Sequence, residues 1–351
     1  MKKLRNEASL QHGKTQSDLF ESLHDDMVIF ILCKLSSTAS SPSDFIAVLH
    51  TCKRLNKLGL HPFVLSKSCS KALAVRAKNW CEEAHKFLKL CVNAGNIEAY
   101  YILGMIRFYC LQNRGSGASL MAKAAVKSHA PALYSLALLQ FNGSGGLKND
   151  KDLGAGVALC ARAACLGHPD SLRELAHCLQ DGYGVRRNIA EGHRLLVQAN
   201  SREFASVLRV LKNKSKHINF DFGLLNDYGF NQASRQMHPV NKFMVEWFGS
   251  KENGVPGPGL KMCSYKGCGR PETRINEFRR CSGCGKVNYC SRGCQAHDWR
   301  LNHKVECAPI EEWMGHAFDD VEEEVNMNGE DYVMDDRTVE IEEGEVDGIE
   351  I

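Results

Sequence analysis

The chain has 351 residues, a length that predicts two or three domains. Its 44 basic residues nearly balance 41 acidic ones, but 15 of the acidic residues lie within 319–351 beside one arginine, so the remainder carries a formal charge of +17. The N-terminus lacks the apolar stretch of a secretory signal, and no run approaches the ~18 apolar residues of a membrane span. We therefore expect an intracellular protein, in the nucleus, the cytoplasm or both, whose 16 cysteines are metal ligands or buried thiols rather than disulfides.

The first structured segment is expected to be a helical hairpin over 17–66. Residues 1–16 before it are polar and are expected to be disordered. Apolar residues recur every four positions over 23–35, which predicts a helix with two aspartates in its first turn. A serine-rich stretch breaks this pattern, and a second helix is expected over 44–58, ended by the glycine and proline that follow it.

This hairpin resembles an F-box, a small helical module that docks onto a Skp-type adaptor of cullin ubiquitin ligases. The resemblance is carried by Leu-His-Asp-Asp at 23–26, by the apolar residues within 31–35 and by Thr-Cys-Lys-Arg-Leu at 51–55. One position departs from the family pattern, because F-boxes usually have a proline where His24 stands. Proline there presets the first helical turn. A hairpin that only caps the next domain is the alternative.

Residues 67–213 contain an internal repeat. A block that starts with a small residue occurs at 99–104, 132–137 and 171–176. Each block is followed by a glycine-rich segment that is expected to be a turn, at 114–117, 142–146 and 181–184. A period of roughly 33 to 40 residues with two helices per unit predicts a helical solenoid. The pattern resembles SEL-like repeats, a tetratricopeptide-related class. The concave surface of such a solenoid would bind protein, or the solenoid would be a rigid spacer.

Residues 214–262 are expected to form an irregular connector. Two aromatic-rich stretches lie in it, at 220–230 and 243–248, and both are expected to pack on the last repeat. A run of glycines and prolines at 254–259 indicates a linker or a rigid turn.

Seven cysteines and one histidine follow in four pairs within 263–307. The pairs are Cys263 and Cys268, Cys281 and Cys284, Cys290 and Cys294, and His303 and Cys307. Eight such ligands can fill two tetrahedral zinc sites, and four protein ligands in each site indicate structural rather than catalytic zinc. The segment has too few apolar residues for an ordinary core, so metal is expected to hold it together. The spacing alone allows either sequential or interleaved pairing.

A helix expected over 295–306 would put His303 and Cys307 on one face, with Ser291 as a plausible N-cap. His297 is the rival ligand, but its spacing to Cys307 is too long for one helical face.

The spacing resembles the MYND zinc finger, together with the tyrosine before Cys290 and the tryptophan before the final histidine. That resemblance implies interleaved ligands. Cys263, Cys268, Cys290 and Cys294 would hold the first zinc, and Cys281, Cys284, His303 and Cys307 the second. It also implies a module that binds short, often proline-rich peptides. The candidates for its contact surface are Tyr265, Phe278, Tyr289 and Trp299, each of which could instead belong to a small core around the metals.

The last segment, 308–351, is expected to be a disordered acidic tail, which either keeps the chain soluble or contacts the basic body or a partner. The order of F-box, repeats and finger resembles a plant family of F-box proteins. The resemblance implies a non-catalytic substrate-recognition subunit of a cullin-type SCF ubiquitin ligase. The alternative is an interaction scaffold in transcriptional regulation without a ligase role. We do not expect nucleic acid as a partner, because no helix of the finger presents a regular base-reading face.

Overall fold

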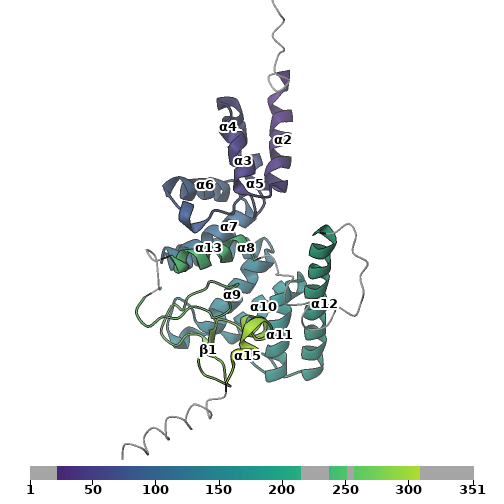
Figure 1. The fold of residues 1–351 in the computed structure, drawn as a ribbon, viewed down its shortest axis with the longest axis vertical. Coiled ribbons are helices and arrows are strands. Elements are labelled where there is room, and N and C mark those ends of the chain that lie inside the picture. Colours follow the sequence, from purple (N-terminus) through teal and green to yellow (C-terminus); the bar gives the residue numbers. More distant parts are fainter. Residues whose placement is uncertain (1–21, 215–236, 251–256, 309–351) are drawn as a thin grey trace, which may run out of the picture. The chain divides into compact units, whose positions relative to one another are not determined.

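The computed structural model describes residues 22–214, 237–250 and 257–308, and most of its elements are helices (Figure 1). The expected disordered segment 1–16, the aromatic stretch at 220–230 and the acidic residues beyond 308 lie outside the described part. Within that part, no helix combines the length and the apolar character that crossing a membrane requires.

In the described part of the F-box-like segment, from residue 22 on, the two helices of the expected hairpin are replaced by four named helices. They are α2 (Asp25–Thr38), α3 (Pro42–Leu49), α4 (Lys53–Gly59) and α5 (Pro62–Lys67). The expected helix over 44–58 is split because Cys52 is extended and its Sγ accepts the N–H of Leu55, which makes it the N-cap of α4. Pro62 starts α5 instead of ending a helix, since proline fits the first helical position.

These four helices enclose a small apolar core. The most buried side chains belong to Val28, Leu32, Phe45 and Val64. At the edge of the core, Arg54 of α4 pairs with Asp25 at 2.7 Å and donates to the carbonyl of Leu23, which fixes the start of α2.

Asn96 joins this module to the repeats. Its amide nitrogen donates to the carbonyls of Leu65 and Ser68, both at 2.8 Å, while its Oδ1 accepts the N–H of Ala99. One buried side chain therefore caps a repeat helix and satisfies two carbonyls at the end of α5.

The repeats form three helix pairs and a final long helix. The pairs are α6 (Glu82–Asn93) with α7 (Ile97–Met105), α8 (Arg114–Val126) with α9 (Ala130–Asn142), and α10 (Leu153–Cys165) with α11 (Pro169–Asp181); α12 (Ile189–Lys214) follows. A π-helical turn, Ile106–Cys110, extends α7. The small residues that begin the repeated blocks, Ala99, Ala132 and Ser171, are fully buried, and each N–H is bonded by an N-cap three residues earlier. Each repeated block in the sequence therefore marks the first turn of the second helix of a repeat pair.

Two of the three expected glycine-rich turns are present, and one is not. Gly143 and Gly182 are left-handed and end α9 and α11. The segment at 114–117 is instead the first turn of α8. A Cβ on Gly117 would lie 2.6 Å from the backbone nitrogen of Phe108, so this glycine allows two helices to approach closely.

The second half of the expected connector is also helical. Helix α13 (Pro239–Gly249) starts with a proline after the N-cap His238. It packs on α7, on the π-helical turn and on residues 77–79, and therefore on the first repeat pair rather than the last. Phe243 meets Trp80 edge to face at 5.4 Å, and Glu246 pairs with Arg76 at 2.8 Å. These aromatic and charged partners lie at the start of the repeats, a position that the sequence order does not reveal.

The C-terminal described segment is a compact finger. It contains the antiparallel strands β1 (Arg279–Arg280) and β2 (Asn288–Tyr289), helix α14 (Arg292–Asp298), a π-helical turn (Trp299–His303) and α15 (Lys304–Glu306). One continuous cluster of buried apolar residues extends from Val28 in α2 to Cys294 in the finger. The F-box-like helices, the repeats and the finger therefore share a core.

Candidate metal centre

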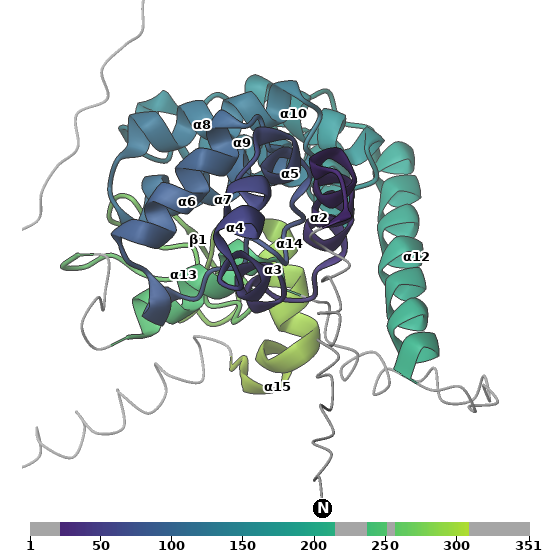
Figure 2. The ribbon, with the colours of Figure 1, turned by 90° about the horizontal axis from the view of Figure 1, so that it is seen from above.

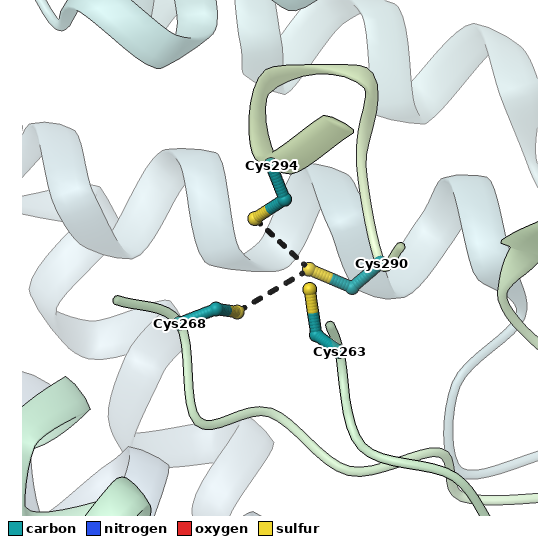
Figure 3. Close-up of side chains that lie close together, drawn as sticks. All are labelled: Cys263, Cys268, Cys290 and Cys294. Atoms are coloured by element: carbon teal, nitrogen blue, oxygen red, sulfur yellow. Dashed lines mark hydrogen bonds between the residues drawn. The ribbon is translucent and has the colours of Figure 1, made fainter. Parts of the chain in front are cut away.

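The first cluster brings together the thiols of Cys263, Cys268, Cys290 and Cys294. Their Sγ atoms all lie within 4.8 Å of one another, and Figure 3 shows them converging on one point. The sulfur of Cys290 lies 3.5 Å from that of Cys268 and 3.6 Å from that of Cys294. All four side chains are buried. The first and third pairs of the sequence thus lie together, as interleaved pairing requires.

The second cluster contains Cys281, Cys284, His303 and Cys307, again within 4.8 Å of one another. The sulfurs of Cys281 and Cys307 are 3.9 Å apart, and Cys284 Sγ lies 3.5 Å from His303 Nε2. The helix expected at 295–306 begins earlier, at Arg292, and contains the π-helical turn. Cys307 lies just beyond α15 with an extended backbone, so it is not on the same helical face as His303.

Both clusters have the dimensions of a zinc site. Zinc–sulfur bonds of about 2.3 Å in a tetrahedron place the sulfurs about 3.8 Å apart, close to the distances seen here. The pKa of Cys268 lies well below its ordinary value, because the neighbouring thiols, Cys263 first, donate to it and Arg270 adds positive charge. The pKa of Cys263 is raised, chiefly by burial, and that of Cys294 is raised, chiefly by its hydrogen bond with Cys263. Burial alone would raise the pKa of Cys281, but the N–H groups of Cys284 and Gly283 and the imidazole of His303 lower it to about 6. Deprotonated sulfur is the form that zinc binds.

Short-range hydrogen bonds hold the ligand loops. The N–H of Cys263 donates to the carbonyl of Arg270, and that of Cys281 donates to the carbonyl of Val287. Ser291 caps α14 by accepting the N–H of Cys294 at 3.0 Å, as the sequence indicated. These hydrogen bonds within the finger position the cysteines independently of a metal.

The finger lies against α9 and α11 of the repeats (Figure 2). Asn142 of α9 donates to the carbonyl of Cys290 at 2.9 Å. Glu174 of α11 accepts the N–H groups of Arg292 and Gly293. Arg274 donates to the carbonyls of Asn142 and Gly143. The finger therefore covers part of the surface of α9 and α11 in the repeats, which were expected to bind protein.

His297, the rival ligand, lies away from both clusters. Its Nε2 is 3.0 Å from Asp170 of α11 and 3.9 Å from Glu203 of α12, which itself pairs with Arg173 and Arg300 at 2.9 Å. This group links the finger to the last repeat helices.

The four candidate contact aromatics differ in how deeply they are buried. Tyr289 and Phe278 are buried and support the finger from within. Tyr265 stacks on His297. Trp299 is 41% exposed and lines a cavity of about 610 Å³ between the finger and α11, together with Arg279.

Sequence reasoning did not identify Arg270 or Glu174, which connect the finger to the repeats. The pairing of Ser135 with Arg270 and of Glu174 with α14 spans more than a hundred residues, so no local pattern could have indicated either.

The fold and the site define a helical-repeat protein with a zinc-type finger of the MYND class. A family model described as plant tetratrico peptide repeats matches residues 71–171, and the model of the MYND finger matches residues 263–307. F-box protein At5g50450 of Arabidopsis thaliana is 63% identical over 307 residues, which cover 87% of this chain and 90% of that protein. F-box protein At1g67340 of the same plant is 58% identical over 315 residues, 86% of this chain and 83% of that protein. The chain belongs to this family of plant F-box proteins.

Among solved structures, a Sel1 repeat protein from Oxalobacter formigenes aligns with 53% of this chain and 59% of its own, at 17% identity and a TM-score of 0.37. The F-box relatives, the repeats and the finger support a role in protein interaction. The two clusters fit zinc.

Proposed function

We propose that this protein is the non-catalytic substrate-recognition subunit of a cullin-type SCF ubiquitin ligase. Residues 22–67 would dock a Skp-type adaptor. The finger and the repeats would hold a target protein, with two structural zinc ions in the finger, one on Cys263, Cys268, Cys290 and Cys294 and the other on Cys281, Cys284, His303 and Cys307.

The observation that carries this proposal is an exposed apolar face on α2. Met27, Phe30 and Ile31 are 54%, 59% and 39% exposed, and their i, i+3, i+4 spacing places them on one face of the helix. Phe63 of α5 is 53% exposed as well. Large exposed apolar side chains that gather on one small module mark a protein-binding surface. The opposite face of α2, with Leu32, is buried in the module, so Leu32 supports the fold rather than the contact.

His24 does not prevent this docking surface from forming. It occupies the N-cap of α2 with φ −64°, a backbone that proline also adopts, and it contacts Asp26 at 3.4 Å. The backbone at this position is therefore one that the usual proline would also permit.

Co-purification with a Skp-type adaptor tests the proposal. The full-length chain should bind the adaptor, and Phe30→Asp should reduce binding at least about tenfold because a charge would enter an apolar contact. Val126→Asp is the matched control, since Val126 is 79% exposed but lies on repeat helix α8. A wild-type chain that binds no adaptor would contradict the ligase role and favour the scaffold without one.

A further inference from the structure

Arg270 is a buried guanidinium, only 5% exposed. Among the described residues, no carboxylate forms an ion pair with it. Its Nη1 donates to Cys268 Sγ at 3.5 Å, and its Nη2 donates to Ser135 Oγ of α9 at 2.9 Å.

A buried cation is costly unless an anion compensates it. Four neutral thiols would leave Arg270 uncompensated. Four thiolates on one divalent zinc carry a formal charge of about −2, and Arg270 would offset half of it inside the core. The buried arginine and the buried sulfurs therefore stabilise each other when the sulfurs are thiolates, which is the form that binds zinc.

Arg270 also connects the first cluster to the repeats. Its carbonyl accepts the N–H of Cys263, so its backbone and side chain contact both members of the first cysteine pair. The hydroxyl of Ser135, which accepts from Arg270, lies 3.1 Å from the hydroxyl of Tyr101 in α7. A short chain of hydrogen bonds thus runs from the sulfur of Cys268 to two repeat helices.

The second cluster has different surroundings. Backbone N–H groups at Gly283 and Cys284 donate to Cys281, and among the described residues no arginine hydrogen-bonds its sulfurs. Cys307 is only half-buried.

We infer that Arg270 is a positioning residue for the first metal site, which it neutralises and couples to the seating of the finger on α9. This inference rests on the zinc binding proposed above. Metal in the first site should strengthen the contact between finger and repeats, and that contact should in turn slow metal loss.

Zinc release from the full-length protein tests the inference. The variants are Arg270→Met, which removes the charge, and Arg270→Lys, which keeps it. Arg280→Met is the matched control, because Arg280 is an exposed finger arginine whose side chain, among the described residues, bonds Asn276 and no cysteine. Release would be followed with a chromogenic chelator, and the zinc content by mass spectrometry. Cadmium NMR of the exchanged protein separates a four-sulfur site from a site with three sulfurs and one nitrogen.

Arg270→Met should release one zinc at least about tenfold faster than the control, with Arg270→Lys in between. The four-sulfur cadmium signal should shift or broaden, while the other signal stays. Equal release rates and unchanged signals in Arg270→Met and Arg280→Met would overturn the inference and leave zinc binding intact. A wild-type chain without zinc would instead overturn the proposed metal binding.

If Arg270→Met does not fold, Ser135→Ala keeps the test decisive. It deletes only the hydroxyl on the repeat side. It should speed release by a smaller factor and shift the four-sulfur signal. No change in either would contradict the coupling.

Discussion

Glu174 accepts hydrogen bonds from the backbone N–H of Gly293, at 3.2 Å, and from that of Arg292, at 3.0 Å. A carboxylate from repeat helix α11 thereby caps finger helix α14, whose own cap, Ser291, reaches only Cys294. Glu174 is buried, and burial raises its pKa against the opposing effect of the Gly293 N–H and of Arg292. The helix start and the carboxylate satisfy each other.

Glu174→Ala should destabilise the docked finger by about 1–3 kcal/mol, because two N–H groups of α14 would lose a buried acceptor. The measurement is thermal unfolding together with limited proteolysis of 263–307. Glu191→Ala is the control, since Glu191 pairs on the surface with Arg194 of the same helix and contacts no part of the finger that the structure describes. An unchanged melting temperature and cleavage rate in Glu174→Ala would show that the cap contributes nothing.

Removal of metal should unfold the finger and uncover part of the repeats. With the chelator bound to zinc, backbone hydrogen exchange should increase in 263–307 and at the finger-facing residues of α9 and α11. The helices α2 to α5 should keep their protection, because their most buried apolar side chains, such as Val28, Phe45 and Val64, come from these helices themselves. Retained protection of the finger after complete zinc removal would contradict a metal-dependent fold.

Two glycines at the start of α8 should respond in opposite ways to alanine. Gly117→Ala should cost about 1–3 kcal/mol, because its Cβ would lie 2.6 Å from the backbone of Phe108. Gly115→Ala should be neutral or stabilise by up to about 1 kcal/mol, since nothing lies within 4 Å of its Cβ. Denaturant unfolding of both variants measures the difference. Equal stabilities would mean that the helices separate at no cost.

Stability should also depend on Glu98 in acid. Burial raises the pKa of this carboxyl, but His129 and His238, at 3.2 and 3.4 Å, outweigh burial and hold the pKa at about 2. A lowered pKa means that the stabilisation is complete above the ordinary value of 4.5 and is lost as the pH falls towards 2. Because the carboxylate is 31% exposed, we expect about 1–2 kcal/mol.

Melting of wild type and Glu98→Gln across this range checks the expectation. The gap between the two melting temperatures should be complete above pH 4.5 and should close as the pH falls towards 2. Acid also releases metal, but it does so in both proteins, so the difference isolates Glu98. The exposed Glu82→Gln variant is the control. A gap that is independent of pH would refute the assignment.

The sequence by itself determined the elements whose causes are local. The spacing of eight ligands predicted the residues of both clusters, and the repeated small residues at Ala99, Ala132 and Ser171 marked helix starts. N-caps, left-handed glycines and ligand pairs act over a few residues, so they can be read from the chain. The pairing of the clusters was left open by spacing and entered through the resemblance to the MYND finger.

Only the tertiary structure decided what those elements contact. Helix α13 packs on the first repeat pair, the finger covers α9 and α11, and Arg270 reaches Ser135 across 135 positions of the chain. The start of α8 at Arg114, which brings Gly117 against Phe108, also depends on such contacts. These tertiary contacts are stabilised by burial and by polar groups that the whole fold pairs. A local sequence pattern shows neither the burial nor the pairing.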